Sequence, residues 1–287
     1  MHKLQDTELI LSPENKIYHL NLSKDEIADD IILVGDPERV QIISSKFDTI
    51  EHKIQNREFI THTGTLNGKR ITAIATGIGP DNIDIVINEL DALVNIDFKT
   101  RTINKNKKIL NLIRLGTSGA LQQDIKVDTF IAASYGLGFD GLAHFYQNQE
   151  ILEQEMATSY ANHAALPSNL ASPYFVKAST NLLSLFPDIK QGITATAPGF
   201  YGPQGRILRL KPSIKNLHEK MESFKYQENR ITNFEMETSA LYYLGQSLGH
   251  NTLTICAIIA NRLTKKYSSD YKKTVEEMID LVLKRIC

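Results

Sequence analysis

The 287-residue sequence lacks long apolar runs and has few cysteines. No apolar stretch approaches the ~20 residues that would cross a bilayer, and residues 1–6 carry no apolar core leading to a small-residue cleavage site. We therefore expect a cytoplasmic protein. Its two cysteines, Cys256 and Cys287, give no basis for a disulfide framework or a metal cluster, and we predict that Cys256 is a small buried hydrophobic residue.

A large excess of charge of one sign is also missing. The chain has 32 lysines and arginines against 33 aspartates and glutamates, a formal net charge of -1. Because nucleic acids and anionic membranes attract strongly basic proteins, this balance argues against both as partners. Any anion-binding site must then be local. With 42% hydrophobic and 23% charged residues and no internal repeat, the composition is typical of a globular protein.

Apolar runs that alternate with helical patterns predict an α/β fold. We expect buried strands at residues 31–34, 109–115, 127–134, 192–197 and 251–259, a hairpin over 56–75 with Asn67-Gly68 at its turn, and helices at 38–43, 83–94, 150–165, 175–185, 240–248 and 271–286. These elements favour a single domain over residues 1–287, with a mixed central β-sheet flanked by helices. Residues 1–28 form an N-terminal arm with an extended piece at 17–20, and 97–108 form an exposed loop.

Glycine-rich turns follow several of the predicted strands. Gly35-Asp36-Pro37 leads into a helix that carries Arg39, and Gly116–Ala120 follows Arg114. Backbone amides at such turns bind anions, and arginine adds a charged fork, while Thr117 supplies a hydroxyl. An ordinary turn with a solvated arginine is the alternative at each position.

The segment Asn233-Phe234-Glu235-Met236-Glu237 joins a predicted strand to a helix. Alternation along an extended chain places Glu235 and Glu237 on one side and Met236 on the other. One carboxylate is then suited to cap the helix, while the other accepts hydrogen bonds from a polyol. The alternative is that both glutamates simply lie at the start of a helix and have no binding role.

Two further loops carry candidate chemistry. Phe200 or Tyr201 offers a ring face, Gln204 offers a donor with an acceptor, and Arg206 offers a donor fork, which together suit a cyclic imide such as uracil. A surface turn whose aromatics cover the sheet is the alternative. Residues 136–141 match G-x-G-x-x-G, but no helical pattern follows them, so we predict no dinucleotide site.

The ordered set of motifs resembles the nucleoside phosphorylases of the uridine phosphorylase type. The resemblance extends from His19 to Arg262 and rests on Gly35–Arg39, Asn56–Phe59, Thr76–Gly79, Arg114–Ala120, Phe200–Arg206 and Phe234–Glu237. It implies the mixed α/β fold of that family and reversible phosphorolysis of uridine to uracil and ribose 1-phosphate in pyrimidine salvage. Relative to compact bacterial members, residues 97–108 are inserted.

The resemblance also implies roles for individual residues. The implied phosphate site consists of Gly35, Arg39, Arg114 and Thr117, with Arg57 from a neighbouring subunit. The implied ribose site consists of Glu237, Met236, Glu235 and the neighbouring subunit's His19, which approaches the 5′-hydroxyl. The implied base site consists of Gln204 and Arg206 on the uracil edge and Phe200 against the ring.

Sites shared in this way imply a homodimer, and bacterial relatives form hexamers. The resemblance implies no cofactor, with inorganic phosphate as co-substrate. A monovalent cation such as K⁺ near Glu58 is a further possibility that the family raises, although Gly79-Pro80 stands where the bacterial type has paired glycines.

Three other functions stay open at this point. A nucleosidase of the same fold uses water, which needs no clamp of three arginines. A purine nucleoside phosphorylase carries an aspartate after the last strand, where this chain has Asn261-Arg262. The third is a catalytically silent nucleoside-binding protein, in which nothing would explain the electrostatic cost of placing the arginines beside Glu237.

Overall fold

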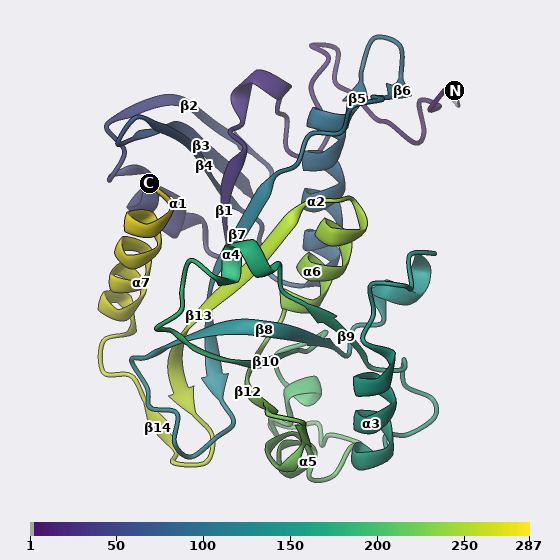
Figure 1. Cartoon of the computed structure of the whole chain (residues 1–287), viewed down its shortest axis with the longest axis vertical. Coiled ribbons are helices and arrows are strands. Elements are labelled where there is room, and N and C mark those ends of the chain that lie inside the picture. The colour runs from purple at the N-terminus through teal and green to yellow at the C-terminus, as the bar shows by residue number, and fades with distance from the viewer. Residues whose placement is uncertain (1–2) are drawn as a thin grey trace.

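A twelve-stranded mixed sheet runs through the centre of the molecule, shown in a computed structural model that describes residues 3–287 (Figure 1). The first two residues of the predicted arm therefore lie outside the described residues. The strands of the sheet are β1 (Asp30–Val34), β2 (Thr49–Asn56), β3 (Phe59–Leu66), β4 (Lys69–Ala75), β7 (Asn111–Ala120), β8 (Phe130–Gly138), β9 (Tyr174–Lys177), β10 (Lys190–Thr196), β11 (Lys225–Tyr226), β12 (Asn229–Glu235), β13 (Asn251–Asn261) and β14 (Lys266–Tyr267). A separate two-stranded sheet pairs β5 (Ile96–Asp97) with β6 (Thr102–Ile103).

In residues 3–287, seven α-helices pack around the sheet. They are α1 (Pro37–Ser44), α2 (Pro80–Asn95), α3 (Gln154–Ala164), α4 (Thr180–Leu183), α5 (Leu217–Ser223), α6 (Thr238–Ser247) and α7 (Tyr271–Ile286). Figure 1 shows α7 on one side of β7 and β13 and the neighbouring helices α2 and α6 on the other. Their apolar faces are buried against the strands, so one large core joins both sides of the sheet.

The order of the strands brings the candidate site residues to one place. The sheet has the order β11-β12-β10-β8-β13-β7-β1-β4-β3-β2, and β7 is parallel to both β1 and β13. In addition, Phe234 of β12 pairs with Gly119 of β7, which closes β12, β10, β8, β13 and β7 into a ring. The end of β12 therefore lies beside the second half of β7, next to the end of β1.

The predicted fold class is confirmed, and most predicted elements are present. The Asn67-Gly68 turn joins β3 to β4 with φ values of 52° and 77°, as a two-residue hairpin turn requires. Cys256 is fully buried in β13, and burial raises the pKa of its thiol to about 12. The glycines of the G-x-G-x-x-G match lie partly within β8, where a Cβ on Gly136 would come within 2.9 Å of Ser239 Cα. That glycine permits close packing of β8 against α6.

Three predicted elements are wrong in part. Residues 18–20 form a turn and not an extended piece, because Asn21 adopts a φ of 53° and the carboxylate of Glu89 accepts the N–H groups of His19 and Leu20. Residues 174–177 form β9 and not the start of a helix. Their aromatic and β-branched side chains are buried while the strand pairs with β8.

The third difference concerns β7, which was expected to end at Leu115 before a glycine turn. It continues to Ala120, because the small residues 116–120 pair with residues 256–261 of β13. β1 pairs with β7 only as far as Leu115. The turn that follows β1 therefore lies next to the later part of β7. Within the predicted exposed loop 97–108, the β5–β6 hairpin is a further element that the pattern missed.

Candidate active site

Two glutamates at the joint between β12 and α6 have different tasks. The carboxylate of Glu235 accepts the N–H groups of Glu237 at 2.9 Å and of Thr238 at 3.1 Å, so it caps α6. It also accepts the hydroxyl of Thr196 at 2.8 Å. Glu237 accepts the N–H of Gly79 at 2.9 Å with one oxygen and a guanidinium N–H of Arg114 with the other. Both carboxylates are buried on the same side, as the alternation predicted.

Arg114 is a single cation between two buried carboxylates. Its Nη1 lies 3.2 Å from Glu235, and its Nη2 pairs with Glu237. Burial raises the pKa of Glu237 to about 7, since the attraction of Arg114 is opposed by the negative charge of Glu235. Burial lowers the pKa of Arg114, but the two carboxylates outweigh this and the net change is upward. The raised pKa of Arg114 and the raised pKa of Glu237 are consistent with each other. Two carboxylates stabilise the one guanidinium cation, whereas the two carboxylates have only that one cation between them.

A second arginine faces the same point from α1. Asp36 caps α1 by accepting the N–H of Glu38 at 3.0 Å, and it lies 4.0 Å from Nε of Arg39. Burial lowers the pKa of Arg39; Asp36 opposes this, while the charge of Arg114 lowers it further. Arg39 and Arg114 are therefore close enough for their charges to repel, although they come from α1 and β7.

The turn after β1 brings the backbone of Gly35 close to Gly77 and Arg114. A Cβ on Gly35 would lie 3.3 Å from the carbonyl oxygen of Gly77 and 3.9 Å from Nη2 of Arg114. Within residues 3–287, Nε and Nη1 of Arg114 are buried and form no hydrogen bond, although Nη1 lies near Glu235, and the half-buried Thr117 hydroxyl has no hydrogen-bond partner. Unpaired buried donors beside a second arginine suit a bound anion.

The predicted base-binding residues gather in the loop after β10. Nη1 of Arg206 donates to the carbonyl oxygen of Phe200 and to Oε1 of Gln204, both at 2.5 Å. The guanidinium also lies over the Phe200 ring, 3.5 Å from its centre. Gln204 is buried, and Phe200 is half exposed. Burial and the nearby charge of Arg262 lower the pKa of Arg206 to about 10.

His19 and Arg57 both contact Tyr18. Arg57, at the tip of the β2–β3 hairpin, donates to the hydroxyl of Tyr18 at 3.1 Å and packs over its ring. The Tyr18 ring meets the His19 ring edge-on with centres 4.8 Å apart. Among the described residues, no hydrogen bond or ion pair joins His19 or Arg57 to Arg114 or Glu237 of the same chain.

Met236 is half-buried at the start of α6, and Glu58 is exposed beside Arg57. Glu58 Cγ would lie 3.8 Å from a Cβ on Gly77, so this hairpin approaches the turn after β4. Across residues 3–287, no group of three or more histidine, cysteine, aspartate or glutamate side chains is placed to hold a metal ion. In the same part of the chain, none of the helices has the length and apolar character to cross a membrane.

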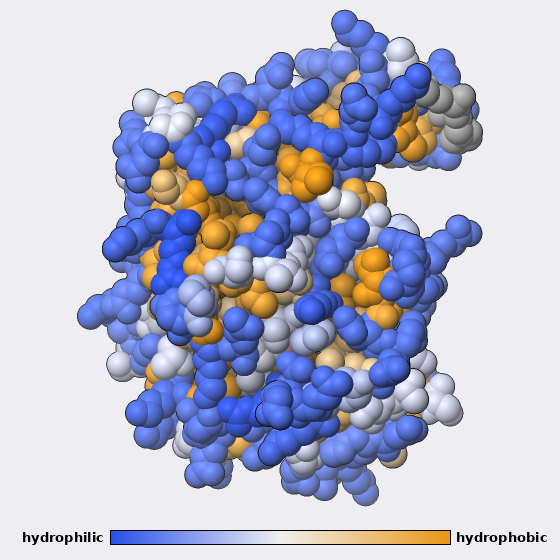
Figure 2. All heavy atoms as spheres, viewed as in Figure 1, coloured by the Kyte–Doolittle hydropathy of each residue, from blue (hydrophilic) through white to orange (hydrophobic). Residues whose placement is uncertain are grey.

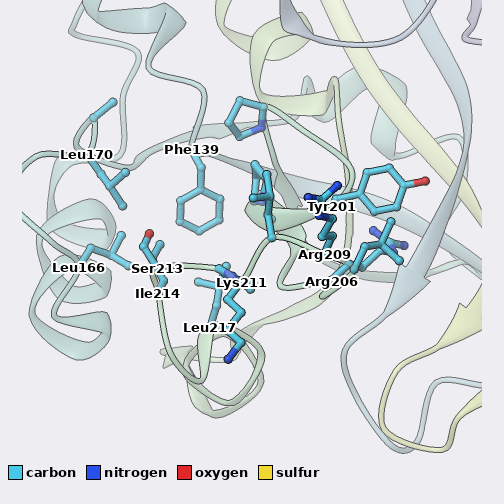
Figure 3. Close-up of a pocket in the computed structure, with 17 residues that line it drawn as sticks. Phe139, Leu166, Leu170, Tyr201, Arg206, Arg209, Lys211, Ser213, Ile214 and Leu217 are labelled. Carbon is cyan, nitrogen blue, oxygen red and sulfur yellow. The ribbon is translucent and has the colours of Figure 1, made fainter.

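A cavity of about 690 Å³ opens beside the loop after β10. Figure 3 shows Phe139 between Leu166 and Leu170 on one side and Tyr201 and Arg206 on the other. Arg206 and Tyr201 are the candidate base-binding residues in its lining, and Arg114 and Glu237 lie outside it. On the face shown in Figure 2, hydrophilic residues predominate and hydrophobic ones form separate patches.

Sequence reasoning missed several contacts of the candidate site. Thr196 and Gly79 bind the two glutamates, and Arg262 packs over the Phe234 ring at 5.0 Å with a buried Nη2 that has no partner in the described chain. The position of Arg262 directly after the last buried strand was a signal of its place at this edge. Gly79 lies in the Thr76–Gly79 motif that the sequence singled out. Its contact with Glu237, like that of Thr196 with Glu235, had no local signal, because the partners are distant in the sequence.

Comparison with known proteins defines the class to which this fold and site belong. The model of the phosphorylase superfamily matches residues 29–287. A uridine phosphorylase of Thermococcus kodakarensis is 31% identical over 276 residues, which are 95% of this chain and 87% of the relative. A DeoD-type purine nucleoside phosphorylase of Brevibacillus brevis is 30% identical and covers 92% of this chain and 96% of its own.

A solved structure gives the same result. The crystal structure of a Trypanosoma brucei nucleoside phosphorylase, described as showing uridine phosphorylase activity, has a TM-score of 0.87 and 28% identity and covers 96% of this chain and 98% of its own. The predicted family is confirmed: the chain belongs to the phosphorylase superfamily.

Proposed function

We propose that this protein is a uridine phosphorylase, a pentosyltransferase that converts uridine and inorganic phosphate to uracil and ribose 1-phosphate in pyrimidine salvage. The observation that carries the proposal is the convergence of Arg39 and the unsatisfied donors of Arg114 beside the buried carboxylate of Glu237. Relatives named as uridine phosphorylases that align along nearly the whole chain support it.

In the proposed reaction, an oxygen of phosphate bonds to C1′ of the ribose as the bond from C1′ to N1 of uracil breaks. Gly35, Arg39, Arg114 and Thr117 hold phosphate, and Arg57 of a second subunit completes the clamp. Holding the dianion against C1′ makes the attack nearly intramolecular. Phosphate takes over donors of Arg114 and so releases Glu237 to accept the 2′- and 3′-hydroxyls, while Met236 packs on the sugar and Glu235 fixes the segment.

The leaving uracil carries the electron pair of the broken bond and then takes a proton from water. Gln204 and Arg206 donate hydrogen bonds to the uracil edge, with Phe200 against the ring. Arg262, beside Arg206, adds positive charge at this end of the site. Preorganised donors of this kind stabilise a delocalised anion without a strong general acid.

Asn261 supports a pyrimidine in preference to a purine. Its amide N–H groups donate to the carbonyl oxygens of Gln122 and Ile125 at 2.9 and 2.7 Å, and its oxygen accepts the N–H groups of Leu263 and Thr264. With all these groups engaged, Asn261 cannot protonate a purine leaving group. The similarity to a purine nucleoside phosphorylase nevertheless makes inosine the second substrate to test.

The proposal includes a homodimer, or a hexamer built from three such dimers, in which His19 and Arg57 of one subunit enter the site of its partner. Within the described residues of one chain, no hydrogen bond or ion pair joins them to Arg114 or Glu237, which supports this arrangement. Nucleoside and phosphate are the proposed small-molecule partners, and the cytoplasm is the proposed location. A K⁺ ion near Glu58 stays a prediction. Comparing the activity in added KCl with the activity in added NaCl would test it.

The test is uracil release from uridine by the purified protein, with and without inorganic phosphate, with inosine in parallel. The proposal expects release from uridine only when phosphate is present. Release without phosphate means a nucleosidase, and phosphate-dependent cleavage of inosine alone means a purine enzyme. Uridine binding without turnover means a silent binding protein.

A further inference from the structure

One carboxylate on α2 holds the turn that carries His19. The backbone N–H of His19 donates to both carboxylate oxygens of Glu89, at 3.0 and 3.1 Å. The backbone N–H of Leu20 donates to one of them at 2.8 Å. The same carboxylate lies 2.6 Å from Nδ1 of the His19 ring. The two side chains are 29% and 12% exposed, so solvent is partly excluded from the pair.

This geometry fixes which ring nitrogen carries hydrogen. An ionised carboxylate can only accept, so the short contact requires a hydrogen on Nδ1. In the neutral ring, Nε2 is then an acceptor. Nε2 of His19 has no hydrogen-bond partner among residues 3–287.

The rest of the turn is also held in place. The side-chain amide of Asn56, in β2, donates to the carbonyl oxygen of His19 at 2.8 Å. Tyr18 links His19 to Arg57 through the ring contact and the hydrogen bond described above. His19 and Arg57 thus form one surface although they belong to the arm and to the β2–β3 hairpin.

The arm before this turn is tied to the 97–108 segment by Arg101. Its side chain donates to the carbonyl oxygens of Leu4 and Gln5, both at 3.0 Å, and of Leu9, and its own carbonyl oxygen accepts the N–H of Leu4. Figure 1 shows the N-terminal arm beside β5 and β6. The 97–108 segment therefore braces the arm, and Glu89 sets the ring at its far end.

We propose that Glu89 is a positioning residue: it holds His19 as the tautomer with hydrogen on Nδ1, so that Nε2 accepts the 5′-hydroxyl hydrogen of a nucleoside bound in the neighbouring subunit. The assignment rests on the proposed function for the identity of the ligand. The tautomer follows from Glu89, and it can be measured without any substrate.

The first test is nuclear magnetic resonance of the full-length protein with ¹⁵N-labelled histidine and without nucleoside, at about pH 9, more than two units above the ordinary histidine pKa, where the ring is neutral. His19→Asn assigns the His19 signals. We expect a protonated Nδ1 and an unprotonated Nε2, and a changed tautomer ratio in Glu89→Gln. Hydrogen on Nε2 alone, or on both nitrogens, would overturn the proposal whatever the enzyme's substrate is.

The second test separates positioning from general support of the fold. Glu89→Gln should raise KM for uridine about three- to tenfold, the worth of one hydrogen bond, with KM for phosphate and kcat nearly unchanged. With 5′-deoxyuridine, which lacks the hydroxyl, wild type and variant should have equal KM.

Glu26→Gln is the matched control, since Glu26 is a half-buried carboxylate of the same arm that pairs with Lys16 and does not contact His19. It should leave KM for uridine within about twofold, a change too small for a lost hydrogen bond. Equal effects of Glu89→Gln on uridine and 5′-deoxyuridine, or no effect on either, would contradict the positioning role while leaving uridine phosphorolysis intact. Loss of the proposed function itself would appear as inactive wild type.

Discussion

At the scale of the residue, the guanidinium of Arg114 is shared by the carboxylates of Glu235 and Glu237 in the interior. The three groups together carry one excess negative charge away from water. Burying an ion pair is costly unless further partners compensate, and removal of one partner leaves an uncompensated charge. An incoming phosphate brings more negative charge, which in the proposed site is balanced by Arg39 and by Arg57 of a second subunit.

This charge balance predicts how stability depends on pH. The folded pKa of Glu237, about 7, lies above its ordinary value of 4.5, so the folded state binds the extra proton. The contribution of Glu237 to the free energy of unfolding is therefore fully present below about pH 4.5 and is lost as pH rises through 7, a change of the order of 3 kcal/mol. Glu237→Gln should lose less stability than wild type between about pH 5 and pH 8.

Urea unfolding at the two pH values measures this difference. Glu276→Gln, on the exposed side of α7, is the control and should behave like wild type. An equal pH dependence in wild type and Glu237→Gln would show that Glu237 does not take up the proton.

At the scale of the element, β7 positions Arg114 by the small residues that follow it. A Cβ on Gly116 would overlap Nη1 of Arg114 and lie 3.2 Å from Sγ of Cys256. Because Arg114 is enclosed, Gly116→Ala should displace the guanidinium and lower kcat/KM for phosphate by about 10- to 100-fold, or about 1.4 to 3 kcal/mol.

Gly119→Ala on the same strand is the matched variant, since a Cβ there meets nothing within 4 Å. It should keep wild-type kinetics and melting temperature. Steady-state kinetics against phosphate at saturating uridine makes the comparison. Similar losses in both variants would mean that β7 tolerates no added methyl group and that Arg114 is not the cause.

Sequence patterns predicted much of this site, for reasons that are local. Alternation placed Glu235 and Glu237 on one side, and the turn at Asn67-Gly68 follows from its two residues. What was missed depends on which strands become neighbours. The β12–β7 pairing sets Arg114 against both glutamates, and β9 forms because β8 offers an edge to a short aromatic segment.

At the scale of the whole molecule, His19 and Arg57 form no hydrogen bond or ion pair with Arg114 or Glu237 among the described residues of one chain, and the proposed site takes them from a second chain. Glu237→Gln and Arg57→Ala should each be nearly inactive as homodimers. Mixed after unfolding and refolding, they should recover about a quarter of wild-type activity, because about half of the dimers are hybrids and one site of each hybrid is complete. Activity no greater than the sum of the separate variants would contradict a shared site.

The central claim is that phosphate, and not water, attacks C1′ and accepts the ribosyl group. The most direct measurement is ³¹P nuclear magnetic resonance of uridine and inorganic phosphate incubated with the protein, with uracil measured in the same sample. The account predicts one ribose 1-phosphate for each uracil formed, and regeneration of uridine when both products are supplied. Uracil accompanied by free ribose, with the phosphate signal unchanged, would contradict it.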